Sequence, residues 1–105
     1  MSAEPEEDDG RTPRQRDRDR KYRDHVARLQ RRERLEGCVT EVRRIYQSLR
    51  YRAERGSQEW SEFDELWRHH SEVEKTVFLL PVAEQERILE EYPKLAHQLK
   101  AKYGR

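Results

Sequence analysis

Histidine and cysteine, the side chains most typical of zinc sites and of covalent catalysis, are few in this sequence. Its four histidines stand at positions 25, 69, 70 and 97, and its single cysteine is Cys38. A metalloprotease-type pair needs two histidines one helical turn apart. The adjacent His69 and His70 instead point about 100° apart on a helix. We therefore expect no metal site and no cofactor, and we interpret His70 as a half-buried structural residue.

Covalent catalysis requires a nucleophile beside a general base and an orienting group. Cys38 instead lies beside Val39 and Val42 in an apolar stripe, where a cysteine acts as a small hydrophobic residue. The four glycines are scattered along the chain, so they form no phosphate-binding loop. The sequence predicts a protein that is not an enzyme and has no evident small-molecule substrate.

The clearest positive signal is a basic run between Arg11 and Arg34. Residues 11–36 hold eleven basic and five acidic residues. Such a run can neutralise nucleic-acid phosphates, and arginine-rich segments can fold on RNA. The alternative is a solvated helix, because the acids offset almost half of the positive charge. The nucleic-acid-binding candidates are Arg14, Arg16, Arg18, Arg20, Lys21, Arg31 and Arg32.

Aromatic residues supply the second candidate surface. Exposed aromatic side chains anchor protein interfaces, and the same residue types also fill the core of a small bundle. The apolar stripes are doubled, as at Cys38/Val39 and Leu66/Trp67, which suits a helix that contacts two neighbours. The partner-binding candidates are Tyr46, Trp60, Phe63, Trp67 and Phe78.

These two surfaces lead to two functional hypotheses. The first is a non-catalytic protein–protein interaction or complex-assembly factor that binds a protein partner or a copy of itself. The second is a nucleic-acid-associated factor that uses residues 11–34 as a phosphate-binding arm.

The elements that must position these residues are helices. Apolar residues recur at alternating spacings of three and four, which is typical of amphipathic helices. No stretch alternates as a strand does, so the fold is predicted to be all-α. A short stripe of Tyr22, Val26 and Leu29 falters at Glu33. The three longer stripes are Leu35, Cys38, Val42, Ile45 and Leu49; Phe63, Leu66, His70, Val73, Val77 and Leu80; and Ile88, Tyr92, Leu95, Leu99 and Tyr103.

Several boundaries stay open in the sequence. Residues 17–55 form either one long helix or two helices joined near Gly37, and the next helix starts at Ser57 or Ser61. Pro93 either kinks one final helix or stands in the first turn of a second. The stripe that begins at Leu35 keeps its heptad phase for little more than two repeats before Gly56. This length is too short for a sustained coiled coil.

Charge and apolar content divide the chain. Charged residues make up 43 % and hydrophobic residues 32 %, with a net charge of +1. Residues 1–9 carry five acids and no base, whereas residues 57–105 carry seven bases and ten acids. Only seven of the first 37 residues are hydrophobic. We predict a disordered tail over 1–16, a basic solvated helix over 17–37 and a compact unit over 38–105. The fold is then a small three- to four-helix bundle, or a helical hairpin, with a long, partly solvated first helix.

The composition also excludes several classes of protein. The longest apolar run, residues 77–83, has seven residues, whereas a membrane span needs about 20. One cysteine excludes a disulfide scaffold and fits a reducing compartment, the cytoplasm or the nucleus. The first residues lack the pattern of a secretory or mitochondrial signal.

Overall fold

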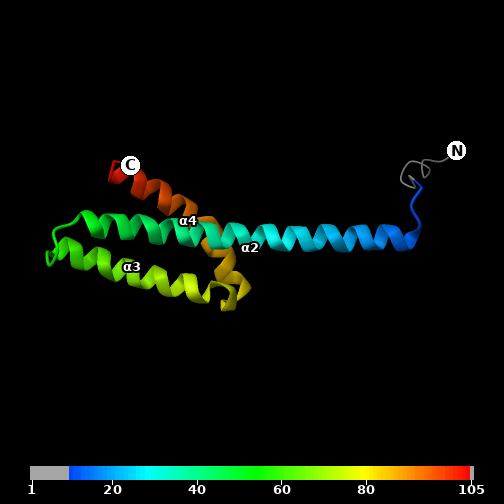
Figure 1. The fold of residues 1–105 in the computed structure, drawn as a ribbon, viewed down its shortest axis with the longest axis horizontal. Coiled ribbons are helices and arrows are strands. Elements are labelled where there is room, and N and C mark those ends of the chain that lie inside the picture. The colour runs from blue at the N-terminus through cyan, green and yellow to red at the C-terminus, as the bar shows by residue number, and fades with distance from the viewer. Residues whose placement is uncertain (1–9, 105) are drawn as a thin grey trace. The chain divides into compact units, whose positions relative to one another are not determined.

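The computed structural model describes residues 10–104. These residues form three α-helices and one short 3-10 helix, and no strand occurs among them (Figure 1). The elements are α2 (Pro13–Arg52), α3 (Gln58–Thr76), η1 (Val77–Leu79) and α4 (Val82–Lys102). The predicted all-α class and small helical bundle are confirmed.

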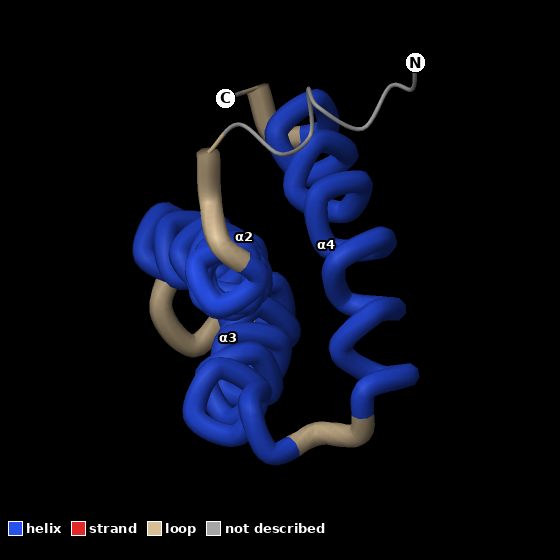
Figure 2. Tube along the Cα trace, turned by 90° about the vertical axis from the view of Figure 1, so that its right-hand side faces the viewer, coloured by secondary structure: helices blue, strands red, loops and turns tan. Residues whose placement is uncertain are grey.

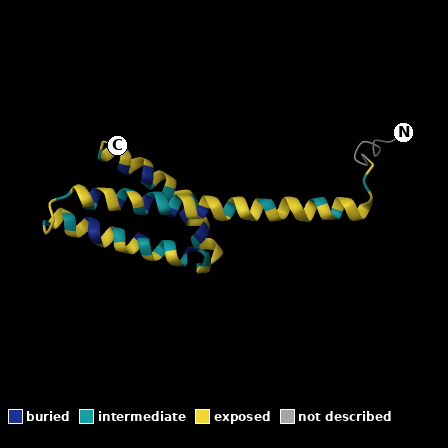
Figure 3. Cartoon of the chain, in the orientation of Figure 1, coloured by how far each residue is buried: buried dark blue, intermediate teal, exposed yellow. Residues whose placement is uncertain are grey.

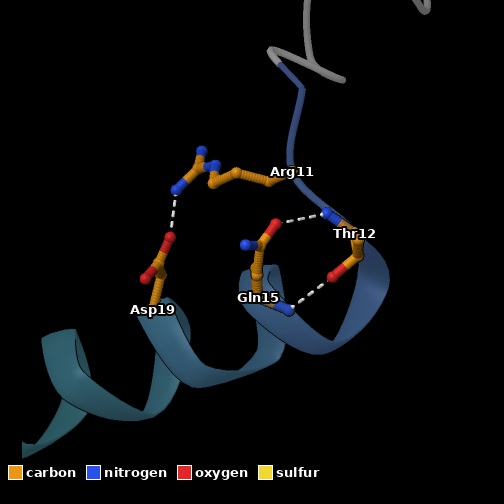
Figure 4. Close-up of polar contacts among 4 residues, drawn as sticks. All are labelled: Arg11, Thr12, Gln15 and Asp19. Carbon is orange, nitrogen blue, oxygen red and sulfur yellow. Dashed lines mark hydrogen bonds and ion pairs between the residues drawn. The ribbon is translucent and has the colours of Figure 1, made fainter.

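Helix α2 begins with a reciprocal cap (Figure 4). The Gln15 backbone N–H donates to Thr12 Oγ1 at 3.1 Å, and the Thr12 N–H donates to Gln15 Oε1 at 2.8 Å. This is a capping box, and Pro13 occupies the first helical position, where its missing N–H is not needed. Residues 13–16 are therefore helical, which corrects the predicted tail over 1–16. Residues 1–9 of that tail lie outside the described residues.

A single helix covers the stretch for which one or two helices were expected. Helix α2 continues through Gly37, whose position is exposed. A glycine inside a helix costs about 1 kcal/mol relative to alanine. Burial of Leu35 and Val39 on either side of it offsets this cost.

The chain divides into two units between Arg31 and Arg32. In residues 10–31 no side chain is buried, as the mainly yellow first part of α2 indicates (Figure 3). The second unit starts at Arg32 and contains the rest of α2 together with α3, η1 and α4. The compact unit begins before the predicted residue 38, because Leu35 is already 0 % exposed.

Helix α3 is bounded by a serine cap and a change of helix type. Ser57 Oγ accepts a hydrogen bond from the Trp60 N–H at 3.1 Å, which selects Ser57 over Ser61 as the cap. The helix ends at Thr76, η1 follows, and Leu80 is extended before Pro81. An extended residue is what a following proline favours.

Helix α4 is one helix that contains Pro93. Proline removes a backbone hydrogen bond inside a helix. Pro93 lies on the exposed side, where water can satisfy the carbonyl group left without a donor.

The second unit has a core in two parts, and both join α2 to its neighbours. Within this unit α4 packs beside α2 and α3 (Figure 2). The doubled apolar stripe of α2 therefore serves contacts with two helices of the same chain. One cluster contains Val42, Tyr46, Leu49, Phe63, Ala96 and Leu99, and the other Leu35, Val39, Val77 and Ile88.

His70 lies where the three helices meet. Its ring stacks on Tyr46 of α2 at 5.2 Å between centroids and meets Tyr92 of α4 edge-on at 5.4 Å. His70 is only 6 % exposed, so it is buried rather than half-buried as predicted. Its Nδ1 is 2.8 Å from the Leu66 carbonyl oxygen. Burial lowers the pKa of His70, which favours the neutral ring with Nδ1–H as the donor.

Candidate functional site

The five predicted partner-binding aromatics do not form one surface. Tyr46 and Phe63 are buried in the core, at 6 % and 7 % exposure. Phe78 is half-buried, and the Arg32 guanidinium lies over its ring at 3.9 Å. Trp60 and Trp67 are also half-buried. These two indoles lie on α3 and share one neighbour, Arg50.

Arg50 connects the end of α2 to the start of α3. Its Nη1 donates to Asp64 Oδ1 at 2.7 Å. Its guanidinium carbon lies 4.1 Å from the Trp67 ring centroid and 6.0 Å from that of Trp60. Stacking on indole rings together with a carboxylate contact suits the planar guanidinium of arginine and not the ammonium of lysine.

Asp64 holds a second arginine. Arg68 Nε donates to Asp64 Oδ2 at 2.7 Å, so each carboxylate oxygen has its own arginine donor. These hydrogen bonds, with Arg68 first and Arg50 second, hold the pKa of Asp64 below its usual range. The carboxylate is therefore ionised at neutral pH and fixes the positions of both arginines.

An open depression lies beside this ion-paired group. Tyr51 on its border is 88 % exposed, and Arg55 is also exposed. The lining carries three arginines against one carboxylate, so it is positively charged. We call this surface the arginine–aromatic corner; it consists of Gln47, Arg50, Tyr51, Ala53, Arg55, Trp60, Asp64 and Arg68.

The predicted nucleic-acid-binding residues follow α2 but do not share one face. Arg14 and Arg18 are four residues apart and lie on one side, whereas Arg16 and Arg20 lie on the opposite side at 3.6 residues per turn. Arg20 and Lys21 both pair with Asp17, with the Lys21 Nζ–Asp17 Oδ2 distance 3.3 Å. Arg32 belongs to the second unit and contacts Phe78.

Sequence reasoning missed most of the corner. It selected Trp60 but not Arg50, Asp64 or Arg68. The spacing of Asp64 and Arg68 is a helical i,i+4 pair and is visible in the sequence. The pairing of Arg50 with Asp64 depends on how α2 and α3 pack, so the local pattern does not reveal it.

Cys38 shows the surroundings predicted for it. It is half-buried beside Leu35 and Ile88, and its Sγ lies 3.3 Å from the Leu35 carbonyl oxygen. Burial raises the pKa of this thiol, which disfavours the reactive thiolate.

Residues 10–104 lack two other kinds of site. Within this range, no group of three or more histidine, cysteine, aspartate or glutamate side chains is arranged to hold a metal ion. None of the helices in this part of the chain is both long and apolar enough to cross a membrane.

Comparison of the chain with known protein families, with curated proteins and with solved structures finds no match.

Proposed function

We propose that this protein is a non-catalytic helical interaction module that binds a protein partner at the arginine–aromatic corner. The observation that supports this most is the combination of exposed Tyr51, half-buried Trp60 and three arginines around one depression. Tryptophan, tyrosine and arginine are the residues most enriched among those that dominate binding energy.

The corner is also held in place before any partner arrives. Arg50 is fixed by Asp64 and by two indole rings, and Arg68 by the same carboxylate. A binding surface that is already ordered loses less side-chain entropy on association. Arg50 and Arg68 are therefore positioned in advance beside the exposed Tyr51 and Arg55, and this favours binding at the corner.

The charge of the corner selects the partner. Three positive charges, those of Arg50, Arg55 and Arg68, outnumber the one negative charge of Asp64. The complementary surface is therefore an acidic segment with an apolar side chain that contacts Trp60. Two copies of the corner would bring like charges together, which costs several kcal/mol at an interface. The proposed partner is therefore a different protein.

The test is a comparison of proteins captured by the wild-type chain and by two variants. The corner variant carries Tyr51→Ala and Arg55→Glu. The control variant carries Leu79→Ala and Arg44→Glu, which change an exposed hydrophobic residue and an exposed arginine elsewhere in the same unit. Affinity purification with mass spectrometry identifies the proteins that each one retains.

We expect a protein with an acidic segment that the wild type and the control retain and the corner variant loses. Truncation of a dominant contact residue weakens binding by about 2 kcal/mol, or about 30-fold. Equal capture by all three chains would refute the proposal. Light scattering at low micromolar concentration provides a second check, because a dimer that the corner variant abolishes would mean self-association instead.

A further inference from the structure

The first unit carries a basic stripe of its own. Arg14, Arg18, Lys21, His25 and Arg28 follow one another along α2 at spacings of four, three, four and three. Residues at this spacing lie on one face of a helix. All five side chains are exposed. We call this set the basic stripe.

The acids of the first unit do not occupy positions in the stripe. Asp19 pairs with Arg11, as Figure 4 shows. Asp17 borders the stripe, where it pairs with Arg20 and with Lys21. Asp24 also borders the stripe, one helical turn before Arg28. Lys21 is thus partly neutralised, and Arg14 and Arg18, together with Arg28, supply most of the charge.

The arrangement is the reverse of a seam between two helices. A coiled-coil seam has apolar residues at three–four spacing and charges at its edges. Here the charges hold one row of three–four positions, and Tyr22, Val26 and Leu29 form a short apolar row beside them, about one heptad long and too short for a sustained coiled coil. Tyr22 follows Arg18 by four residues and is 68 % exposed; Leu29 follows His25 by four and is 46 % exposed. The stripe is therefore unsuited to pairing with a copy of itself.

A linear polyanion matches this face better than a protein helix does. Phosphates need a row of cations and no apolar seam, and binding gains from the release of their counterions. Four of the five stripe residues are arginine or lysine, and the planar arginine fork fits phosphate oxygens. Tyr22 at the border offers a ring for stacking on a base, which is how proteins hold single strands.

We propose that the basic stripe binds the phosphate backbone of a single-stranded nucleic acid, with Tyr22 stacking on a base. This surface lies in a different unit from the arginine–aromatic corner, and it takes a different class of ligand. Each proposal can therefore fail without the other.

The test measures fluorescence anisotropy of a labelled oligouridylate of about 20 nucleotides with the full chain. The stripe variant carries Arg14→Gln, Arg18→Gln and Arg28→Gln. The matched control carries Arg16→Gln, Arg20→Gln and Arg23→Gln, which remove the same charge from the opposite face. Glutamine keeps a helix propensity close to that of arginine, and circular dichroism at 222 nm checks that both variants stay helical.

We expect the stripe variant to lose at least about tenfold in affinity at about 50 mM salt. Its log–log salt slope should become shallower by about 2, because each single-strand phosphate contact contributes about 0.7. The control should lose clearly less affinity than the stripe variant and should keep a salt slope close to that of the wild type, because the arginines that it replaces make no phosphate contact. Tyr22→Ala should weaken binding at least about fivefold, because base stacking carries part of the affinity.

Four results would overturn the proposal. The first is no binding by the wild type at low salt. The second is an equal loss in both variants, which would mean general charge attraction without a defined face. The third is binding to a duplex as strong as to the single strand, with no effect of Tyr22→Ala. The last is tighter binding to a poly-glutamate peptide than to the oligouridylate, which would assign the stripe to an acidic protein.

Discussion

Residues 13–31 and residues 32–52 belong to the same helix, α2, and continue the same three–four spacing of positions. In the first stretch these positions hold Arg14, Arg18, Lys21, His25 and Arg28, all exposed. In the second they hold the exposed Arg32 and then Leu35, Val39, Val42, Tyr46 and Leu49, all five buried. Local backbone structure is therefore shared, and the residue type at the repeated positions decides whether the helix packs against neighbours.

The two stretches also owe their helical structure to different interactions. The first is held by the Thr12–Gln15 capping box and by side-chain pairs such as Asp17–Lys21, each worth tenths of a kcal/mol to about 1 kcal/mol. The second is held by apolar burial, at roughly 1.5–3 kcal/mol for each large side chain. A short helix without tertiary packing is only marginally stable in water.

The sharpest test replaces equivalent positions in the two stretches. Val42→Asp places a carboxylate where the side chain is 0 % exposed, and we expect a loss of more than about 4 kcal/mol, enough to unfold a small unit. Arg28→Asp, two heptads earlier, should change stability by less than about 0.5 kcal/mol. Tryptophan fluorescence during urea unfolding measures this, because both tryptophans lie in the second unit. Similar losses in the two variants would contradict the comparison.

Amide hydrogen exchange compares the two stretches without mutation. Residues 39–49 should be protected on the order of 10³-fold more strongly than residues 17–28, because core amides open only with global unfolding. Mass spectrometry of peptides from each stretch gives the rates. Equal protection would mean that residues 13–31 have a stabilising contact besides the capping box and the side-chain ion pairs.

A pH titration examines the aromatic contact among α2, α3 and α4. Because burial lowers the pKa of His70 in the folded state, its contribution to stability is complete above the unfolded value of about 6.5. That contribution decreases as the pH falls through the folded pKa. The neighbouring Tyr46 and Tyr92 have pKa values raised mainly by burial, so both stay neutral over this range.

The measurement is urea unfolding followed by tryptophan fluorescence at several pH values. His70→Gln should flatten the decrease in stability below pH 6.5, whereas His97→Gln, at an exposed position, should leave it in place. A His70→Gln chain whose stability falls with acid as steeply as that of the wild type would contradict the assignment.

The smallest change concerns the cap of the first stretch. Thr12→Ala removes the acceptor for the Gln15 N–H and should weaken the start of α2 by about 1 kcal/mol. We expect circular dichroism at 222 nm to show less helix, with the tryptophan-monitored unfolding midpoint unchanged. Thr12→Ser keeps an acceptor and is the control. A shift in the midpoint would show that the second unit depends on this cap.

Much of the fold was predictable because helices are specified locally. The spacing of Phe63, His70 and Val77 indicated the helical stretch of α3 and η1 correctly, whereas the choice of Ser57 over Ser61 as the cap came from the structure. The start of α2 was missed, although the pattern Thr12-Pro13-Arg14-Gln15 is a capping box. A periodicity repeats over many residues and is easily recognised in a sequence. A capping box depends on one pair of residues and is easily overlooked.

The candidate sites were harder to predict than the helices. The five predicted partner-binding aromatics differ in burial. Tyr46 and Phe63 are buried in the core, whereas Trp60, Trp67 and Phe78 are half-buried. An apolar stripe shows that a face is buried but not which neighbour covers it. The basic stripe, in contrast, can be recognised in the sequence, because its residues continue the three–four spacing of Leu35 and Val39 toward the start of the chain.

The amino-acid sequence was sufficient for the helical class, the division into a charged stretch and an apolar-rich unit, and the positions of the basic residues. These properties follow from composition and from periodicities of three and four residues, which act over a few turns of one helix. Tertiary structure was needed to bury His70 between two tyrosines and to pair Arg50 with Asp64. Those contacts join residues on different helices, so their formation depends on how the helices pack and not on the local order of residues.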